Sequence, residues 1–386
     1  MAAPQTAPHV ASLRLTDFRS YDALDAAFAP GINVFFGPNG AGKTNLLEAL
    51  SLLSPGRGLR RARVEEITRM DAGGLSSAWG VSARVEGVES ETGEPLRIGV
   101  GQSPDAPRRR LVRVDGQTAS ATSLAEVLSL LWLTPAQDRL FTGPAGDRRK
   151  FLDRFAMTHT PAHGTHTLRY ERARAERNRL LSDGYSDDAW YRAIEADLAR
   201  YGSLIAAARV TTLDLLSGEI ASRPEGPFPK ADVAIEGEAE AAFADGASVD
   251  EVRAHLEARL SDARPEERRA GRTLVGPHRS DLLVVHAPKA MPASACSTGE
   301  QKALLIGLML AHARSHPERA PILLLDEIAA HLDRARRASL ARELGDLGGQ
   351  VFLTGTDRSL FEAFEETARM MEVRDGTVTV VEAGPD

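Results

Sequence analysis

The sequence predicts an α/β protein in which one sheet domain is assembled from both ends of the chain, around an inserted helical domain. Apolar strand candidates alternate with helices in residues 1–146 and 273–386, a pattern typical of a largely parallel sheet with crossover helices. Residues 147–272 instead contain long helical stretches with interspersed opposite charges, which favour solvent-exposed helices. The chain is therefore expected to divide into these three segments.

The N-terminal segment begins with strand candidates of two kinds. "ASLRLTDFRSY" (residues 11–21) alternates apolar and polar residues, as a half-buried strand does, whereas "GINVFF" (31–36) is continuously apolar and ends at a glycine-rich turn. A helix is expected from Thr44 onward. Short strand candidates separated by turn residues predict an attached antiparallel sheet, and they cover residues 77–86, 96–101 and 111–120.

Strand patterns return after the helical segment. Within that segment, residues 223–248 are rich in Pro, Gly and acidic residues and predict a turn region between two helical arms. After Gly271 come "DLLVVHA" (281–287), "PILLLDEI" (321–328) and "GQVFLTGT" (349–356). We expect these apolar runs to join the parallel sheet of the N-terminal segment.

Composition limits the class of protein. The 386 residues carry a formal net charge of −7 and are 42% hydrophobic, which fits a globular chain of two or three packed units. The acidic balance excludes a global field that attracts nucleic acid, so such binding would need a local basic patch. A single cysteine excludes an internal disulfide, and no signal peptide or run of 18 apolar residues is recognisable. We expect a soluble cytoplasmic protein.

The strongest motif is "GPNGAGKT", residues 37–44. It matches G-x-x-x-x-G-K-T and lies between an apolar strand and a helix, which is the context of a phosphate-binding P-loop. The glycines allow the backbone amides to point at phosphate oxygens, and the following helix adds its positive dipole end. Lys43 is expected to reach the β- and γ-phosphates, and Thr44 to offer its hydroxyl to Mg²⁺.

An acid pair ends the strand candidate in "PILLLDEI". Asp326 is expected at the carboxyl end of a buried strand, where it would be the second Mg²⁺ ligand beside Thr44. Glu327 follows directly and is placed to orient or deprotonate an attacking water. An acid pair at a strand end can also be a helix cap, but the P-loop elsewhere in the chain favours the metal and catalytic roles.

The stretch "CSTGEQKALLIGLMLAHAR" (296–314) has two interpretations. Ser297 and Glu300 have the spacing of a capping box, in which each side chain bonds the other residue's backbone amide at a helix start. The same exposed helix start leaves free amides and a positive dipole end that can bind an anion.

Taken together, "GPNGAGKT", "CSTGEQKALLIGLMLAHA" and "LLLDEIAAHLD" resemble the ABC-type ATPases of the SMC-like branch. Within that branch, "LRLTDFRSY", "LTPAQDRLFTGPAGDRRKFLDR" and "LVGPHRSDL" make the chain similar to the bacterial recombination mediators, over nearly its whole length. The resemblance implies a P-loop ABC-type ATPase head of two lobes, with a mixed sheet core plus an antiparallel sheet, and an inserted α-helical arm domain.

The resemblance also implies roles for individual residues. Two heads would dimerise around ATP, with the P-loop of one subunit facing the signature of the other, and Glu327 and Lys43 would be catalytic. Asp333 would lie along the dimer seam. Gln137, or its neighbour Asp138, would be the lid residue that couples nucleotide to the rest of the head. The implied nucleotide contacts are Gly37, Pro38, Asn39, Gly40, Ala41, Gly42, Lys43, Thr44, Asn45, Gln137, Ser297 and Gly299.

A protein of this kind would bind duplex and gapped DNA as an ATP-dependent homodimer. It would act with RecR and RecO to promote loading of RecA, in DNA repair and replication restart, and slow ATP hydrolysis would release the DNA. An SMC-like nuclease subunit would need a metal and acid centre of its own, which we do not find in the sequence. A transporter ATPase is disfavoured by the long helical segment between Thr44 and Ser297.

The sequence departs from the common ABC pattern in ways that affect activity. Thr298 stands where a second signature glycine is usual, and Glu300 replaces a glutamine. A histidine expected near Thr354 to Thr356 is missing, so a non-catalytic scaffold that binds ATP remains an alternative to a slow ATPase. Basic residues have two interpretations, as phosphate or DNA contacts and as solvated side chains: Arg57, Arg60, Arg61, Arg148, Arg149 and Lys150.

Overall fold

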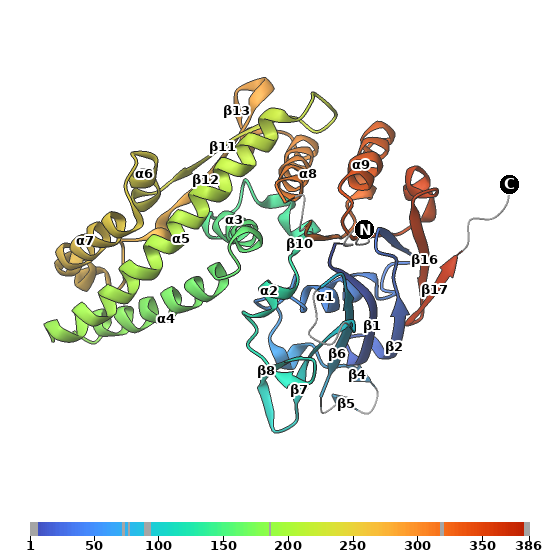
Figure 1. The fold of residues 1–386 in the computed structure, drawn as a ribbon, viewed down its shortest axis with the longest axis horizontal. Helices are drawn as coiled ribbons and strands as arrows, with labels where there is room; N and C mark the ends of the chain where they lie inside the picture. Colours follow the sequence, from blue (N-terminus) through green and yellow to red (C-terminus); the bar gives the residue numbers. More distant parts are fainter. Residues whose placement is uncertain are drawn as a thin grey trace. The chain divides into compact units, whose positions relative to one another are not determined.

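The computed structural model describes residues 7–71, 74–75, 78–88, 94–184, 187–316 and 320–381. Its chain divides into two compact units, and Figure 1 labels many of their helices and strands. The described residues of Met1–Asp138, Gly226–Phe228 and Met309–Asp386 form the first, which we call the head unit. Those of Arg139–Glu225 and Pro229–Leu308 form the second, the arm unit.

The head unit contains a sheet that is parallel except at one edge. Its order is β10-β14-β15-β3-β16-β17, and only β17 runs antiparallel to its neighbour. Every residue of β14 and β15 is buried, which explains why the sequence shows continuous apolar runs there. The strands are β3 (Ile32–Phe36), β10 (Leu130–Leu133), β14 (Ile322–Leu325), β15 (Val351–Gly355), β16 (Ala368–Arg374) and β17 (Thr377–Val381).

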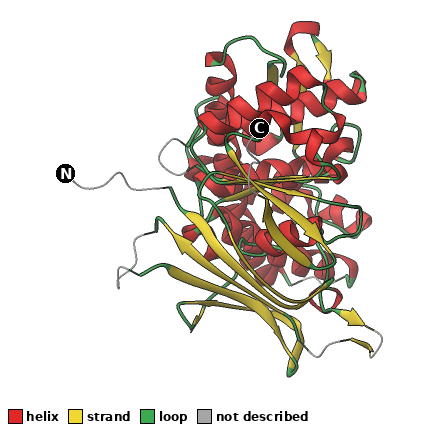
Figure 2. Ribbon diagram, turned by 90° about the vertical axis from the view of Figure 1, so that its right-hand side faces the viewer, coloured by secondary structure: helices red, strands yellow, loops and turns green. Residues whose placement is uncertain are grey.

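A second sheet of the head unit is antiparallel, as the alternating patterns predict. Its order is β2-β1-β6-β7-β8-β9, and the two sheets are drawn as yellow strands in Figure 2. A small pair, β4 (Met70–Asp71) and β5 (Gly74–Leu75), lies outside it. The strands of the larger sheet are β1 (His9–Phe18), β2 (Tyr21–Ala27), β6 (Gly80–Glu86), β7 (Leu96–Ser103), β8 (Ala106–Val114) and β9 (Gln117–Thr118).

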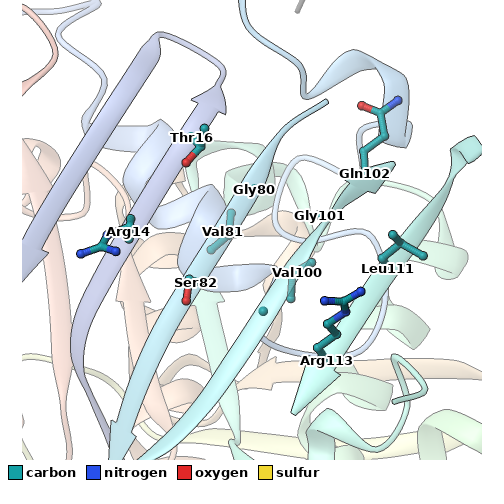
Figure 3. A pocket seen from close by; sticks show the side chains of 11 residues that line it. Arg14, Thr16, Gly80, Val81, Ser82, Val100, Gly101, Gln102, Leu111 and Arg113 are labelled. Carbon is teal, nitrogen blue, oxygen red and sulfur yellow. The ribbon is translucent and has the colours of Figure 1, made fainter. Parts of the chain in front are cut away.

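The outer face of the antiparallel sheet is hollowed where side chains are absent. Gly80 lies opposite Gly101, and Gly99 lies between Ser82 and Arg113 across the strands. The result is a shallow hollow of about 280 Å³, shown in Figure 3, with Arg14 and Arg113 among its lining residues.

Helix α1 (Lys43–Ser51) joins the two sheets into one core. Leu46, Leu47 and Leu50 are fully buried and belong to the same hydrophobic cluster as residues of both sheets. Gln350 adds a polar connection at the start of β15, because its side chain accepts a hydrogen bond from Val10 N and donates to Val10 O, each at 2.8 Å. The P-loop helix is therefore anchored on both of its sides.

The arm unit consists of long helices and a small antiparallel sheet. Helix α5 packs along α4 and α7, while β12 pairs with β11 and β13. The helices are α3 (Ala145–His159), α4 (His163–Ser182), α5 (Asp188–Ser222), α6 (Glu238–Ala244) and α7 (Val249–Ala270). The strands are β11 (Ala231–Glu236), β12 (Asp281–His286) and β13 (Met291–Pro292).

Two expectations for this region were wrong. Residues 223–248, predicted as a turn region, contain β11 and α6. "DLLVVHA" forms β12, which pairs antiparallel with β11 over six residues and does not enter the parallel sheet. Because this pairing draws residues after 272 into the arm unit, that unit extends past the predicted helical segment, to Leu308. An isolated apolar run cannot reveal which distant strand will pair with it.

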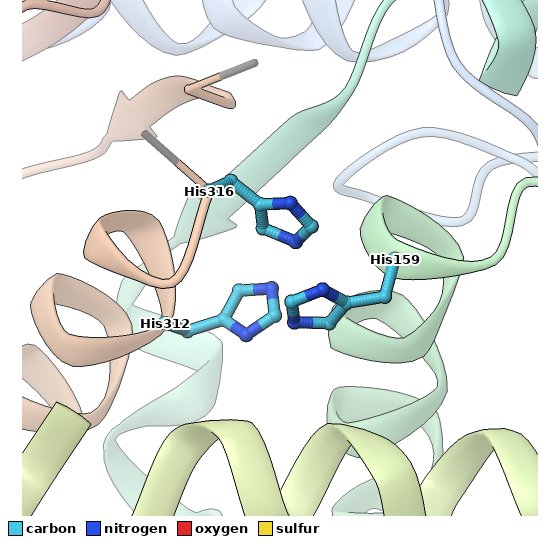
Figure 4. Close-up of side chains that lie close together, drawn as sticks. All are labelled: His159, His312 and His316. Carbon is cyan, nitrogen blue, oxygen red and sulfur yellow. The ribbon is translucent and has the colours of Figure 1, made fainter. Parts of the chain in front are cut away.

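The remaining described helices are short, except for two near the C-terminus. In the head unit, the rings of His312 and His316, drawn in Figure 4, pack edge to face with centroids 5.6 Å apart. Among the residues described, no helix is both long enough and apolar enough to cross a membrane. The helices not yet named are α2 (Leu124–Val127), α8 (Thr298–Arg314) and α9 (Arg334–Asp346).

A buried ion network holds the arm helices together. The fully buried Arg177 of α4 pairs with Glu195 of α5 at 3.0 Å and with Glu267 of α7 at 2.5 Å. It also donates to Leu260 O and to Thr273 Oγ1. Because burying charges is costly unless they are paired, this network fixes the relative register of three helices.

We predict that Arg177→Ala destabilises the arm unit by roughly 3–5 kcal/mol, because it leaves the buried Glu267 carboxylate without its cation and leaves Glu195 paired with Arg264 alone. Urea unfolding followed by circular dichroism measures the change. Arg192→Ala is the control, since Arg192 forms an exposed pair with Asp188 one turn away and its loss should cost less than about 0.5 kcal/mol. Equal midpoints for both variants would contradict the prediction.

Candidate nucleotide-binding site and signature segment

The loop between β3 and α1 has the backbone of a phosphate-binding loop. Gly37, Gly40 and Gly42 all have positive φ angles, of 150°, 82° and 108°. A Cβ at Gly37 would lie 2.2 Å from Val373 O, and one at Gly42 would lie 2.5 Å from the hydroxyl of Tyr21. Glycine is therefore required at both ends of the loop. Between them, Pro38, Asn39 and Gly40 are exposed and Ala41 is half-buried.

Lys43 closes this loop from inside. Its ammonium is buried and donates to Gly37 O at 2.7 Å and to Pro38 O at 2.9 Å. Burial lowers the pKa of Lys43, and the nearby carboxylates of Glu327 and Asp326 act in the opposite direction. The side chain thus places a cation beside the exposed loop amides.

Asp326 and Thr44 come together, although they are 282 residues apart in sequence. The Thr44 hydroxyl donates to Asp326 and lies 2.9 and 3.2 Å from its two carboxylate oxygens. Asp326 follows β14 and is almost fully buried, and its N–H donates to Leu133 O at the end of β10. A hydroxyl and a carboxylate at one point are oxygen ligands of the kind Mg²⁺ prefers.

Thr354, at the end of β15, was not predicted as a site residue. Its hydroxyl donates to Asp326 Oδ1 at 2.7 Å and accepts from the backbone N–H of Glu327 at 3.0 Å. Glu327 has a φ of 54°, an uncommon conformation for a residue with a side chain. Thr354 therefore helps to hold both acids. The sequence signal that could have identified Thr354 as a site residue is its position near the end of an apolar strand.

A polar network extends from the P-loop helix to two other segments. The Asn45 side chain donates to Ser20 Oγ at 2.8 Å and accepts from Arg60 at 2.7 Å. Glu48, one turn later and fully buried, pairs with both Arg19 and Arg60. Residues 18–21 ("FRSY") and the basic loop after α1, residues 52–61, are thus held against the helix that follows the P-loop.

Arg110 of β8 fastens the basic loop from its other side. Its guanidinium donates to the carbonyl oxygens of Leu52, Ser54 and Gly56, just beyond the C-terminal end of α1. Burial lowers the pKa of Arg110 to about 10. A cation at this end of a helix is also favoured by the helix dipole.

Gln137 lies in a short 3₁₀ turn, Pro135–Arg139, directly after β10. Its side-chain oxygen accepts from Thr134 N at 2.7 Å, and its amide donates to Trp132 O at 3.2 Å. The side chain therefore caps the end of its own strand. Because β10 neighbours β14, this turn starts next to Asp326.

The signature segment lies at the start of α8. Ser297, Thr298 and Gly299 are exposed, and no atom lies within 4 Å of a Cβ built on Gly299. Glu300 accepts a hydrogen bond from Ser297 N, as the capping box predicts. The serine hydroxyl, however, donates to the same Glu300 oxygen at 2.8 Å.

Cys296 and Gln301 fix the chain beside the signature. Cys296 is buried, and its thiol donates to Pro292 O at 3.6 Å. The Gln301 amide donates to Cys296 O at 2.8 Å. The chain on both sides of the exposed residues 297–299 is therefore fixed by hydrogen bonds.

The conspicuous basic and histidine motifs of the arm unit are bonded internally. Arg148 forms two 2.7 Å hydrogen bonds with Asp281, and Arg149 donates to Ser280 O. His278 contacts the hydroxyl of Tyr170 at 2.7 Å, and burial lowers the pKa of His278 to about 4. These bonds hold α3 and α4 against the start of β12 and the segment that precedes it.

Asp333 is the N-cap of α9, because its carboxylate accepts from Arg336 N at 2.8 Å. The side chain is exposed. Its observed role is thus the capping of a helix that begins nine positions after the end of β14.

The fold and the loop geometry define a P-loop protein of the ABC-type head class. The family model described as "RecF/RecN/SMC N terminal domain" matches residues 9–379. A Mesorhizobium japonicum protein named DNA replication and repair protein RecF is 50% identical over 375 residues, covering 96% of this chain and 97% of that protein. The protein of that name from Brucella suis is 49% identical, covering 95% of both chains. The chain belongs to the RecF family of SMC-like ABC ATPases.

Solved structures agree on the fold. A structure titled as the recombination mediator protein RecF-ATPrS in the RecFOR pathway matches with a TM-score of 0.81 at 23% identity, covering 98% of this chain and 99% of that one. An Smc head domain with an extended coiled coil, from Pyrococcus furiosus, matches with a TM-score of 0.57 at 16% identity, covering 97% and 96%. The predicted fold class is confirmed.

We predict that Thr354→Val destabilises the head unit by about 1–3 kcal/mol, since it removes the hydroxyl that bonds buried Asp326 and the Glu327 amide. Thr354→Ser should retain most of the stability. The measurement is urea unfolding followed by tryptophan fluorescence. Thr356→Val is the matched control, because Thr356 is exposed two residues later, and a loss of stability equal to that of Thr354→Val would contradict the proposed role.

Proposed function

We propose that this chain is an ATP-dependent molecular switch that dimerises around ATP, holds duplex DNA at gaps or junctions, and releases it on slow hydrolysis. The observation that carries the proposal is the convergence of Lys43, Thr44, Asp326 and Glu327 at the exposed glycine loop. Sequence similarity to proteins named for DNA replication and repair supports the DNA part of the proposal.

The P-loop segment Gly37–Asn45 would bind the ATP phosphates through its exposed amides and Lys43. The oxygen donors of Thr44 and Asp326 fit Mg²⁺, which when bound would neutralise charge on the β- and γ-phosphates. Asp326 is already oriented by Thr354, so little rearrangement is needed to present its carboxylate.

Glu327 is the proposed general base of hydrolysis. Its carboxylate would take a proton from water as the water oxygen bonds to the γ-phosphorus and the bond to the β,γ-bridging oxygen breaks, leaving ADP and phosphate. Lys43 would stabilise the charge that develops on the phosphate oxygens. With no histidine near Thr354, where this class usually has one, we propose that hydrolysis is weak.

Dimerisation is proposed from the signature segment. Ser297 and Gly299 are exposed at the N-terminus of a 17-residue helix, where amides and the helix dipole favour an anion. A γ-phosphate held by a second copy of the chain supplies that anion. ATP would then favour the dimer, because it makes contacts that the monomer lacks.

The DNA part of the proposal needs a local basic surface on an acidic protein. The outer face of the antiparallel sheet offers one, with exposed Arg84 and Arg97 directly opposite each other on neighbouring strands. Arg14 and Arg113 line the adjoining hollow (Figure 3). By family, we propose RecR and RecO as partners and RecA loading as the outcome.

We predict that Ser297→Arg weakens ATP-dependent dimerisation about tenfold or more, which corresponds to ~1.4 kcal/mol. The bulky side chain would occupy the proposed γ-phosphate position. Sedimentation velocity with ATP and Mg²⁺ gives the dimer dissociation constant. Ser294→Arg is the control, because Ser294 is also exposed but precedes the helix. A Ser297→Arg variant that dimerises like the parent would refute the trans signature role.

We predict that Glu327→Gln lowers ATP turnover by about 10²-fold or more while the ATP dimer persists, because the amide cannot accept the proton. Single-turnover hydrolysis with gapped DNA measures the rate, and sedimentation measures the dimer. Glu366→Gln, at an exposed position, should leave both unchanged. Rapid turnover in Glu327→Gln would exclude this residue as the base.

A non-catalytic, ATP-dependent scaffold is the second candidate function. The observation that favours it is Thr354, whose hydroxyl is engaged with Asp326 and the Glu327 amide at the strand end where a histidine is expected. Single-turnover hydrolysis by the unmodified chain separates the two candidates, because only a scaffold would leave bound ATP intact.

A further inference from the structure

We propose that Lys289 is a positioning residue of the signature segment, which holds the Glu300 carboxylate so that Ser297 can turn toward a γ-phosphate. This inference rests on the proposed function, because the signature acts only when a second subunit presents ATP. Lys289 ends the short turn Ala287–Lys289 between β12 and β13. Its ammonium donates to one oxygen of Glu300.

The second oxygen of Glu300 serves Ser297. It accepts from Ser297 N at 2.9 Å and from Ser297 Oγ at 2.8 Å. Both carboxylate oxygens are thus engaged, one by Lys289 and one by the signature serine. The three residues form a chain of hydrogen bonds that ends at the exposed helix start.

The charge of Glu300 is a problem for the proposed anion site. The hydrogen bonds from Lys289 and Ser297 lower the pKa of Glu300 to about 2, so the carboxylate is ionised at physiological pH. It lies within hydrogen-bond distance of the hydroxyl that would contact the γ-phosphate. A fixed negative charge at this distance opposes a second anion, and the cation of Lys289 offsets it.

The serine hydroxyl also has only one proton to donate. In this structure the proton goes to Glu300, so a bond to phosphate requires the serine to leave that partner. Glu300 would then keep Lys289 and the Ser297 amide. A neutral glutamine at this position would bring no anion and would need no lysine.

Backbone hydrogen bonds on both sides of Lys289 fix its position relative to Ser297. Ala290 follows with a φ of 46°, and Ala290 N donates to Ala287 O across the turn. Strand β13 pairs with β12 immediately afterwards. The turn Ala293–Ala295 and Cys296 then lead directly into Ser297. Only eight positions separate the lysine from the serine.

The test compares ATP-dependent dimerisation of the full chain and of the variants Lys289→Ala, Glu300→Gln and the double variant, by sedimentation velocity with ATP and Mg²⁺. We expect Lys289→Ala to raise the dimer dissociation constant about tenfold, through the uncompensated carboxylate. The double variant should return to within about twofold of the parent, since the charge is gone. Arg253→Ala, which removes an exposed ion pair with Asp250 on α7, should match the parent.

Each result has a distinct meaning. If the parent dimerises and Lys289→Ala dimerises equally well, the inference is overturned and the proposed function stands. If Lys289→Ala is weak and Glu300→Gln does not rescue it, the lysine has only a structural role and the inference is again overturned. If the parent itself fails to dimerise with ATP, the proposed function fails and the inference fails with it.

Discussion

The carboxylate of Asp326 is the point on which the rest of the head unit depends. It is almost fully buried and ionisable, so it requires hydrogen-bond donors. They come from Thr44 at the start of α1 and Thr354 at the end of β15. Because Asp326 N also donates to Leu133 O, this residue connects the C-terminal ends of three adjacent strands, β10, β14 and β15.

The arm unit is subject to the same requirement, that buried charges have partners. Arg177 and Arg209 are buried cations, each surrounded by carboxylates from other helices. Arg209 also donates to Pro277 O, next to His278. Arg148 and Arg149, which look like ligand contacts in the sequence, are likewise bonded within the arm unit, whereas residues 297–299 of the signature segment are exposed.

The sequence predicted features that depend on neighbouring residues better than features that depend on pairing between distant segments. The P-loop, α1 and the alternating strands of the antiparallel sheet depend on glycine conformations and on periodicity, which are local. The expectation for residues 223–248 was wrong because β11 needs β12, which begins 33 positions after that region ends. For Ser297 and Glu300 the capping spacing predicted the bond from Ser297 N to Glu300, but not that the serine hydroxyl donates to the same carboxylate oxygen or that Lys289, from another element, bonds the other oxygen.

By itself the sequence determined the loop and helix of the phosphate site, the buried strand ending in the acid pair, and the family to which the chain belongs. Only the tertiary structure decided that Thr354 joins the acids and that Arg148 and His278 are bonded within the arm unit. The physical reason is that a backbone conformation is encoded within a few residues. A hydrogen-bond partner, in contrast, is chosen by which elements pack side by side.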